Sequence, residues 1–199
     1  NQSSAVKKLL ASLYRAGFDE IFLNITNAET EQFVKEMLWQ DLVGFELIKL
    51  QEKKLCIKSI ADLDPESFSA MFKKSFLLLM NFSNEIIDHL QQKKADLSRI
   101  QAQDTEINKI TNLCYRLLSK KMNDRRKIVV YAAMLRNMEK LGDCFKELAM
   151  STARTKKISP ESLVQLQELT QKLRKLFFFL YGKFDVNELL ALNDELRTL

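Results

Sequence analysis

The chain has 199 residues, and 46% of them are hydrophobic, which is enough for the core of one large domain or two small ones. It holds only 4 Gly and 2 Pro, and this scarcity favours long helices over a sheet-rich fold with many turns. Apolar runs such as Phe76–Met80 are far shorter than the roughly 20 residues of a membrane-spanning helix. The start of the chain has no signal peptide pattern, so we expect a cytoplasmic protein without a membrane span. The chain begins without Met and ends within a helical pattern, so we also expect it to be a piece of a longer protein.

The net charge is mildly positive at +5, from 31 basic and 26 acidic residues. The basic pairs mostly mark the ends of predicted elements, so they indicate a solvated surface more than a nucleic-acid interface. The three cysteines, Cys56, Cys114 and Cys144, are widely spaced and form no CxxC pair, which excludes a zinc ribbon or a dithiol redox motif. We expect them to be free thiols, buried or half-buried, in a reducing compartment.

The first 63 residues predict a small α/β domain. Apolar periodicity predicts a helix over 4–16, which Gly17 ends, and a second helix over about 28–40. Three strands are expected, at Glu20–Ile25, Phe45–Leu50 and Leu55–Ile60. Trp39 on the second helix is assigned to the core. This domain shows no Gly-rich loop and no catalytic triad in its sequence.

Residues 64–152 predict a three-helix bundle. Its first helix begins at Asp64-Pro65, where an N-cap precedes a proline at the first helical position, and runs to about Gln92. The second helix covers about 95–121 and the third about 125–152, and the short loops between them make neighbours antiparallel. Residues 153–199 predict further C-terminal helices over 160–181 and 185–198, as a partial second bundle. The expected fold class is therefore mainly α, with a small α/β unit at the N-terminus.

Carboxylates recur on the second and third helices of this bundle. Asp104 and Asn108 are four residues apart, as are Glu139 and Asp143, so each pair shares a helix face. With a turn near residue 122, Asp104 and Glu139 are expected at the same level of the bundle. Gly142 lies inside the third helix, where it costs roughly 1 kcal/mol against Ala, so it indicates a close approach by a neighbouring helix.

Two interpretations of these carboxylates remain open from spacing alone. Buried carboxylates need cations, because an unpaired buried charge is costly. In a salt-bridged polar layer, Arg136 and Lys140 beside Glu139 are the expected ion-pair partners. A metal site built from oxygen ligands without His favours a hard or borderline cation such as Fe, Mn, Mg or Ca.

Parts of the sequence resemble a known family. The stretch Met138-Glu-Lys-Leu-Gly-Asp143, with its Glu-x-x-x-Asp motif, resembles the third-helix signature of the PhoU phosphate-uptake regulators. The stretch Asp104-Thr-Glu-Ile-Asn108 resembles their second-helix Asp-x-x-x-Asp motif, with Asn in place of the last Asp. Upstream segments at 15–21, 44–47 and 64–68 resemble archaeal members, in which a SpoVT/AbrB-like DNA-binding domain precedes such an α/β segment. That DNA-binding part is not in this chain, so we expect no direct nucleic-acid contact.

The resemblance implies a PhoU-like fold of helical bundles, with iron or zinc clusters on the carboxylate motifs of some members. Carried over position by position, it implies metal ligands at Asp104, Asn108, Glu139 and Asp143. The Asn at position 108 removes one charged ligand, and no second Glu-x-x-x-Asp motif follows residue 160, so a second cluster is not expected. The implied function is regulation of phosphate uptake and phosphate signalling, through components of the phosphate ABC transporter or signalling proteins, by a homodimer.

An enzyme is not expected. The single histidine, His89, lacks the Glu-x-x-His spacing of di-metal carboxylate bundles, and we expect it at the surface. The alternative to the regulator is a metal-free helical interaction or dimerisation domain of a transcription regulator. Such a domain would self-associate through the Leu- and Phe-rich segment Leu166–Leu180.

Overall fold

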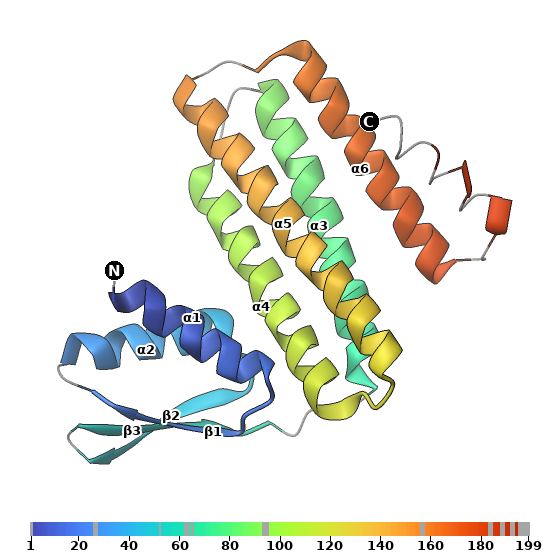
Figure 1. Ribbon diagram of the computed structural model, residues 1–199. Helices are drawn as coiled ribbons and strands as arrows, with labels where there is room; N and C mark the ends of the chain where they lie inside the picture. The colour runs from blue at the N-terminus through green and yellow to red at the C-terminus, as the bar shows by residue number, and fades with distance from the viewer. Residues whose placement is uncertain are drawn as a thin grey trace.

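The computed structural model describes residues 2–25, 28–51, 53–61, 64, 66–92, 96–155, 158–182, 185–187, 190, 191 and 194. The fold is mainly helical, with a small α/β unit at the N-terminus that lies beside a bundle of long helices (Figure 1). This confirms the predicted fold class. None of the helices within the described ranges is both long enough and apolar enough to cross a bilayer.

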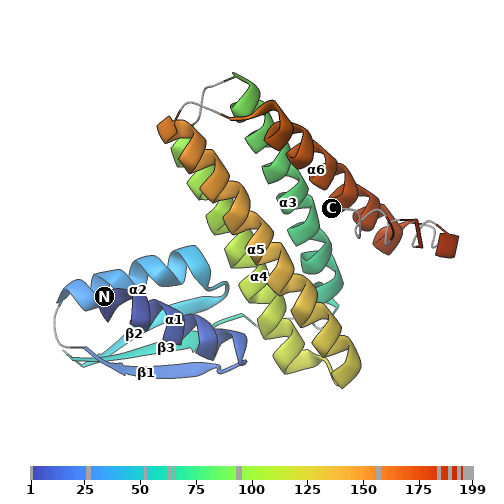
Figure 2. The same ribbon diagram turned by 45° about the horizontal axis from the view of Figure 1, so that its top comes forward.

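The N-terminal unit contains a three-stranded antiparallel sheet with the order β1-β3-β2. Its elements follow in the order α1 (Gln2–Arg15), β1 (Glu20–Asn24), α2 (Ala28–Asp41), β2 (Phe45–Gln51) and β3 (Lys54–Ser59). Both helices lie on the same side of the sheet (Figures 1 and 2). Their apolar stripes meet one face of the strands, which gives a compact core that includes Leu10, Tyr14, Val34, Phe45 and Ile57.

Trp39 does not lie in this core, contrary to the prediction. The buried stripe of α2 runs through Val34, Met37 and Leu38, and the next position along the helix points away from it. Trp39 is therefore 81% exposed. Its ring faces Lys109 of α4, whose ammonium lies 5.7 Å from the ring centroid and donates a hydrogen bond of 2.9 Å to the Trp39 carbonyl oxygen.

The bundle is formed by α3 (Ser67–Gln92), α4 (Leu97–Lys121) and α5 (Arg125–Thr155). A fourth helix, α6 (Pro160–Tyr181), packs against α3 (Figure 2). Three of the predicted helix starts carry a cap: Asp96 accepts from the amide of Ser98, Asp124 from that of Arg126, and Ser159 from that of Ser162. Thr26 and Asn27, which precede the second predicted helix, lie outside the described residues, as do Pro65 and most of the predicted helix 185–198.

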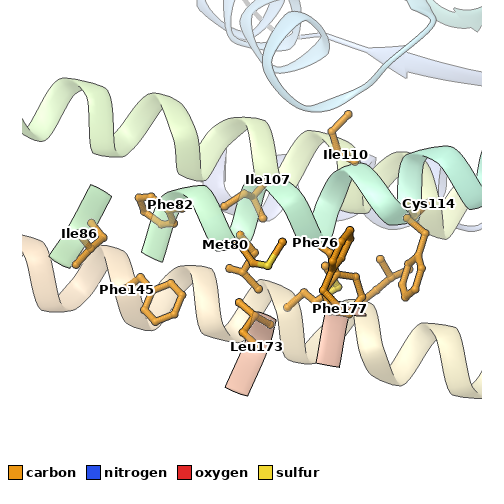
Figure 3. Packing of buried hydrophobic residues seen from close by; sticks show 14 of the residues in the cluster. Phe76, Met80, Phe82, Ile86, Ile107, Ile110, Cys114, Phe145, Leu173 and Phe177 are labelled. Atoms are coloured by element: carbon orange, nitrogen blue, oxygen red, sulfur yellow. The ribbon is translucent and has the colours of Figure 1, made fainter. Parts of the chain in front are cut away.

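The bundle core is a continuous apolar layer between α3, α4 and α5, to which α6 contributes Leu173 and Phe177 (Figure 3). Along α4, residues at alternating steps of three and four face the core: Ile100, Asp104, Ile107, Thr111, Cys114 and Leu118 are all buried, whereas Leu97, which begins the same series, is 43% exposed. Gly142 of α5 lies beside neighbouring helices, as expected. A Cβ at this position would lie 3.8 Å from Ile107 of α4 and 4.0 Å from Leu79 of α3. The bundle core and the core of the α/β unit are separate clusters. The domain boundaries near residues 63 and 152 stay predictions.

Candidate functional site

The predicted site residues lie in a band of charged and polar side chains where α1, α4 and α5 meet, which we call the polar layer. It consists of Arg15, Asp104, Asn108, Thr111, Asn112, Glu139, Asp143 and Lys146. The register of α4 against α5 and the end of α1 bring these residues together, since α1 and α4 pack directly against each other. The layer has two halves, one around Glu139 and one around Lys146.

Glu139 receives a cation from the α/β unit. The Arg15 Nη2 atom, at the last residue of α1, donates to Glu139 Oε1 at 2.6 Å. Thr111 Oγ1 of α4 donates to the same oxygen at 3.1 Å. Burial raises the pKa of Glu139 above its usual range, and the Arg15 charge and the Thr111 hydrogen bond offset this only in part. The carboxylate is therefore held by one charged and one neutral donor.

Arg15 is fixed on both sides. Its Nε atom donates to Asn112 Oδ1 of α4 at 2.5 Å, and its guanidinium carbon lies 4.8 Å from the centroid of the Tyr115 ring. Asn112 is buried and in turn donates to the carbonyl oxygen of Asp41 at 3.3 Å. A planar guanidinium with several donors suits this position between α1, α4 and α5, because it donates to a carboxylate and an amide at once while it stacks on a ring.

The second half of the layer is centred on Lys146 of α5. Its Nζ atom donates to Asp104 Oδ2 of α4 at 2.8 Å and to Asp143 Oδ1, one turn earlier on α5, at 3.0 Å. Burial lowers the pKa of Lys146, but its bonds to the two carboxylates outweigh this and leave the pKa above its usual value. Asn108 Nδ2 approaches Asp104 Oδ2 at 3.5 Å within the same helix. One ammonium thus bridges the buried Asp104 and the exposed Asp143.

The level of the residues differs from the prediction, which placed Asp104 opposite Glu139. Asp104 instead meets Lys146, and Glu139 meets Thr111. Both contacts are centred on residue 125, three residues beyond the expected turn, because Ile107 lies against Gly142 and this contact sets the register of the two helices. The cation partners also differ: Arg136 and Lys140 are exposed, and Arg15 and Lys146 take the role expected of them.

A second junction between the α/β unit and the bundle was not predicted. Arg116 of α4 is only 1% exposed, and its guanidinium carbon lies 5.0 Å from the centroid of the Tyr14 ring and 4.6 Å from that of Phe45. It donates to the carbonyl oxygen of Phe18 at 2.7 Å and to Asp19 Oδ1 at 2.5 Å. The only signal in the sequence was an arginine inside an apolar run of α4. Its partners lie about 70 to 100 residues earlier in the chain and gave no signal.

The fit of a metal ion to the polar layer can be tested on its donor set. Lys146 Nζ lies within hydrogen-bond distance of both Asp104 and Asp143, where a cation shared by these carboxylates would bind. Glu139 is held by Arg15 in the other half of the layer. Over the described part of the chain, no three His, Cys, Asp or Glu side chains are grouped in a way that could hold a metal ion. The residues as arranged do not fit the metal site implied by the resemblance, and they favour the salt-bridged interpretation.

The three cysteines and the single histidine are dispersed over the fold. Cys56 and Cys114 are buried free thiols, while Cys144 is exposed, so the prediction for the cysteines holds for two of the three. Burial raises the pKa of Cys114 to about 12, which leaves it a protonated thiol. His89 is half-buried near the end of α3, where we expected a surface residue, and its buried Nε2 atom has no hydrogen-bond partner among the described residues.

Comparison with known proteins gives no match to any family model, to any curated protein or to any solved structure.

Proposed function

We propose that this chain is a non-catalytic regulatory module that acts by binding other proteins, with the α/β unit and the helical bundle held as one rigid body. The proposal is based on the charged residues that connect the α/β unit to the helical bundle. Glu139 takes its cation from α1, and Arg116 of α4 reaches into the α/β unit. A partly buried pair of this kind is costly to break, because its less exposed partner would lose its counter-charge, so it resists relative movement of the two parts.

Rigid coupling gives the module a way to transmit binding. A partner that docks on the α/β unit and distinguishes two positions of α1 would change the position of Glu139 through Arg15. The same coupling works in reverse for a partner of the bundle, since linkage between two binding sites is reciprocal. In this proposal the side chains of the polar layer hold the helices together through ion pairs and hydrogen bonds, and they take no part in catalysis.

The resemblance to the PhoU regulators supplies the class of partner. By that resemblance, the module acts in regulation of phosphate uptake, on components of the phosphate ABC transporter or on signalling proteins. The proposed form is metal-free, because Lys146 and Arg15 supply the positive charge that the carboxylates need. The alternative function, a metal-free dimerisation domain of a transcription regulator, shares this feature and differs in its partner.

The test is phosphate uptake in the organism that encodes the protein, with the gene deleted and then restored. Deletion is expected to change how uptake responds to low and high phosphate, and the full-length wild-type gene is expected to restore the response. Arg15→Ala is expected to restore it poorly at equal protein level. Arg136→Ala removes an exposed arginine of α5 and serves as the matched control with full restoration.

Uptake that matches the parent strain at both phosphate levels after deletion would contradict the phosphate-regulator proposal. The dimerisation-domain alternative would then be the better account. Equal restoration by Arg15→Ala and Arg136→Ala would contradict the role given to the junction, while leaving the regulator itself in place.

A further inference from the structure

The sheet of the α/β unit has one face that α1 and α2 cover and one face that they do not (Figures 1 and 2). Side chains alternate between the two faces along each strand. Ile21, Phe45 and Ile57 lie on the covered face and are at most 7% exposed. The opposite face, which we call the outer face, therefore carries the residues of the other parity.

The outer face is unusually apolar for a surface in contact with water. Its large apolar side chains, with their exposed fractions, are Phe18 at 53%, Phe22 at 66%, Ile48 at 41% and Ile60 at 60%. Leu50, which is 51% exposed, lies where the register of β2 shifts between Lys49 and Gln51 and the strict alternation is interrupted. Phe18 and Ile60 continue the alternation just beyond the ends of β1 and β3. Monomeric proteins rarely expose so many large apolar side chains on one small sheet, and such a face marks a binding surface.

The register places these residues in rows across the three strands. Phe22 and Ile48 both pair with Cys56 of the central strand, so Phe22, Cys56 and Ile48 form one row, which we call the apolar row. Cys56 is only 4% exposed, between its two larger neighbours. The apolar row lies near the middle of the strands and has charged rows on both sides.

The two flanking rows carry opposite charge. On one side, Glu20 and Glu46 pair in register with Lys58, which forms an ion pair of 2.6 Å with Glu20. This leaves Glu46 without an ion-pair partner among the described residues and gives the row a net charge of about −1. On the other side, Lys54 pairs in register with Asn24 and Gln51, and it too has no ion pair within the described part of the chain.

We propose that the outer face binds the outer face of a second copy of this chain, about a two-fold axis that runs along the apolar row. Rotation about this axis brings each apolar row onto its equivalent, so Phe22 faces the partner subunit's Phe22. The same rotation exchanges the two ends of the strands. The row with Glu46 of one copy then faces the row with the partner's Lys54, twice in each dimer.

Charge selects this axis over the other simple one. A two-fold axis parallel to the strands would bring each row onto its own kind, with Glu46 opposite the partner's Glu20 and Lys54 opposite the partner's Lys54. Like charges opposed in this way are destabilising, whereas the proposed axis opposes rows of unlike net charge. Lys54 then lies opposite the partner's Lys58, whose charge is already paired with Glu20 of the same copy. The outer face is therefore complementary to itself in one orientation, which is the property that an isologous dimer interface requires.

The size of the face sets the strength to expect. Three strands at their usual spacing, about seven residues long, give a footprint of roughly 300 Å². This is well below the roughly 800 Å² per partner of stable complexes, so the dimer is weak and depends on concentration. The inference does not depend on the proposed function, because no residue of the polar layer lies on the outer face.

The first experiment is sedimentation equilibrium of the full chain over a wide range of concentration. The wild type is expected to change from monomer to dimer as concentration rises. Phe22→Lys is expected to weaken dimerisation at least about tenfold, since it places a charge at the centre of the interface. Phe178→Lys, on α6, is the matched control, because Phe178 is 62% exposed and receives the same substitution.

The control also decides between two surfaces. Unchanged dimerisation in Phe22→Lys together with loss in Phe178→Lys would overturn the proposal and assign the interface to α6. A wild type that stays monomeric throughout would overturn it as well, and would leave the outer face to a partner of another kind. Thermal melts followed by circular dichroism show whether both variants keep the fold.

The second experiment tests the orientation by exchange of charge. Glu46→Lys and Lys54→Glu are each expected to weaken dimerisation by roughly tenfold, because each turns two attractive contacts into repulsive ones. The double variant Glu46→Lys/Lys54→Glu restores opposite charges across the proposed axis and is expected to dimerise like the wild type. A double variant weaker than both single variants would overturn the proposed axis.

Discussion

The Arg15 guanidinium of α1 and the Glu139 carboxylate of α5 are 124 residues apart in the chain and 2.6 Å apart in the fold. This contact crosses from the α/β unit to the helical bundle. It also favours the salt-bridged interpretation of the predicted site, because Arg15 brings to Glu139, from outside the bundle, the positive charge that a buried carboxylate needs. A cationic partner for this carboxylate was expected. The residues beside Glu139 in the sequence did not indicate that the partner is Arg15.

The first prediction concerns the strength of this contact. Arg15→Ala leaves Glu139 half-buried without its cation and Asn112 without a donor, so it is expected to lower the free energy of unfolding by about 1–3 kcal/mol. The measurement is chemical denaturation of Arg15→Ala, Glu139→Gln and the double variant. A coupling free energy near zero between the two single changes would show that the pair contributes nothing to stability.

The second prediction concerns pH. Burial, offset in part by Arg15 and Thr111, raises the pKa of Glu139 above its ordinary value of 4.5. Between that value and the raised pKa, the folded protein binds more protons than the unfolded chain. The contribution of Glu139 to the free energy of unfolding therefore falls as pH rises through this window. The stability of the wild type minus that of Glu139→Gln is expected to fall over the same range, and a flat or rising difference would contradict this.

The third prediction separates two glycines. A Cβ at Gly142 would meet Ile107 and Leu79 at 3.8–4.0 Å, which is ordinary contact. Gly142→Ala is therefore expected to stabilise the protein by roughly 0.5–1 kcal/mol through helix propensity. Gly44 has a φ of +74°, and a Cβ there would lie 2.8 Å from the Cβ of Ala61, so Gly44→Ala is expected to be destabilising. Thermal melts of the two variants check both signs, and destabilisation by Gly142→Ala would contradict the packing described.

Local patterns predicted the elements of the fold well. The scarcity of Gly and Pro, the apolar periodicity and the capping residues indicated the long helices, and Asp96, Asp124 and Ser159 act at helix starts in the structure. Alternating apolar residues likewise indicated all three strands. These signals are local, since each depends on residues within one or two turns of a helix or along one strand.

The details of the candidate site depend on distant contacts and could not be predicted in the same way. The level of α4 against α5 is set by Ile107 against Gly142, and a count from the loop missed it by three residues. Arg15 and Arg116 contact residues that are about 100 or more positions away in the sequence, and no local pattern predicts such contacts. Trp39 is exposed, contrary to the prediction, because it lies off the buried stripe of α2, and the aromatic character of a residue does not by itself place it on that stripe.

The central claim is that Arg15 and Lys146 hold the carboxylates of the polar layer in ion pairs. The most direct test is elemental analysis by inductively coupled plasma mass spectrometry of the purified chain, exposed to iron or zinc and then desalted. The control is the double variant Glu139→Gln/Asp143→Asn. We predict that the wild type and the variant both retain no stoichiometric metal. Stoichiometric metal in the wild type that is lost in the variant would contradict the account and establish a metal centre between α4 and α5.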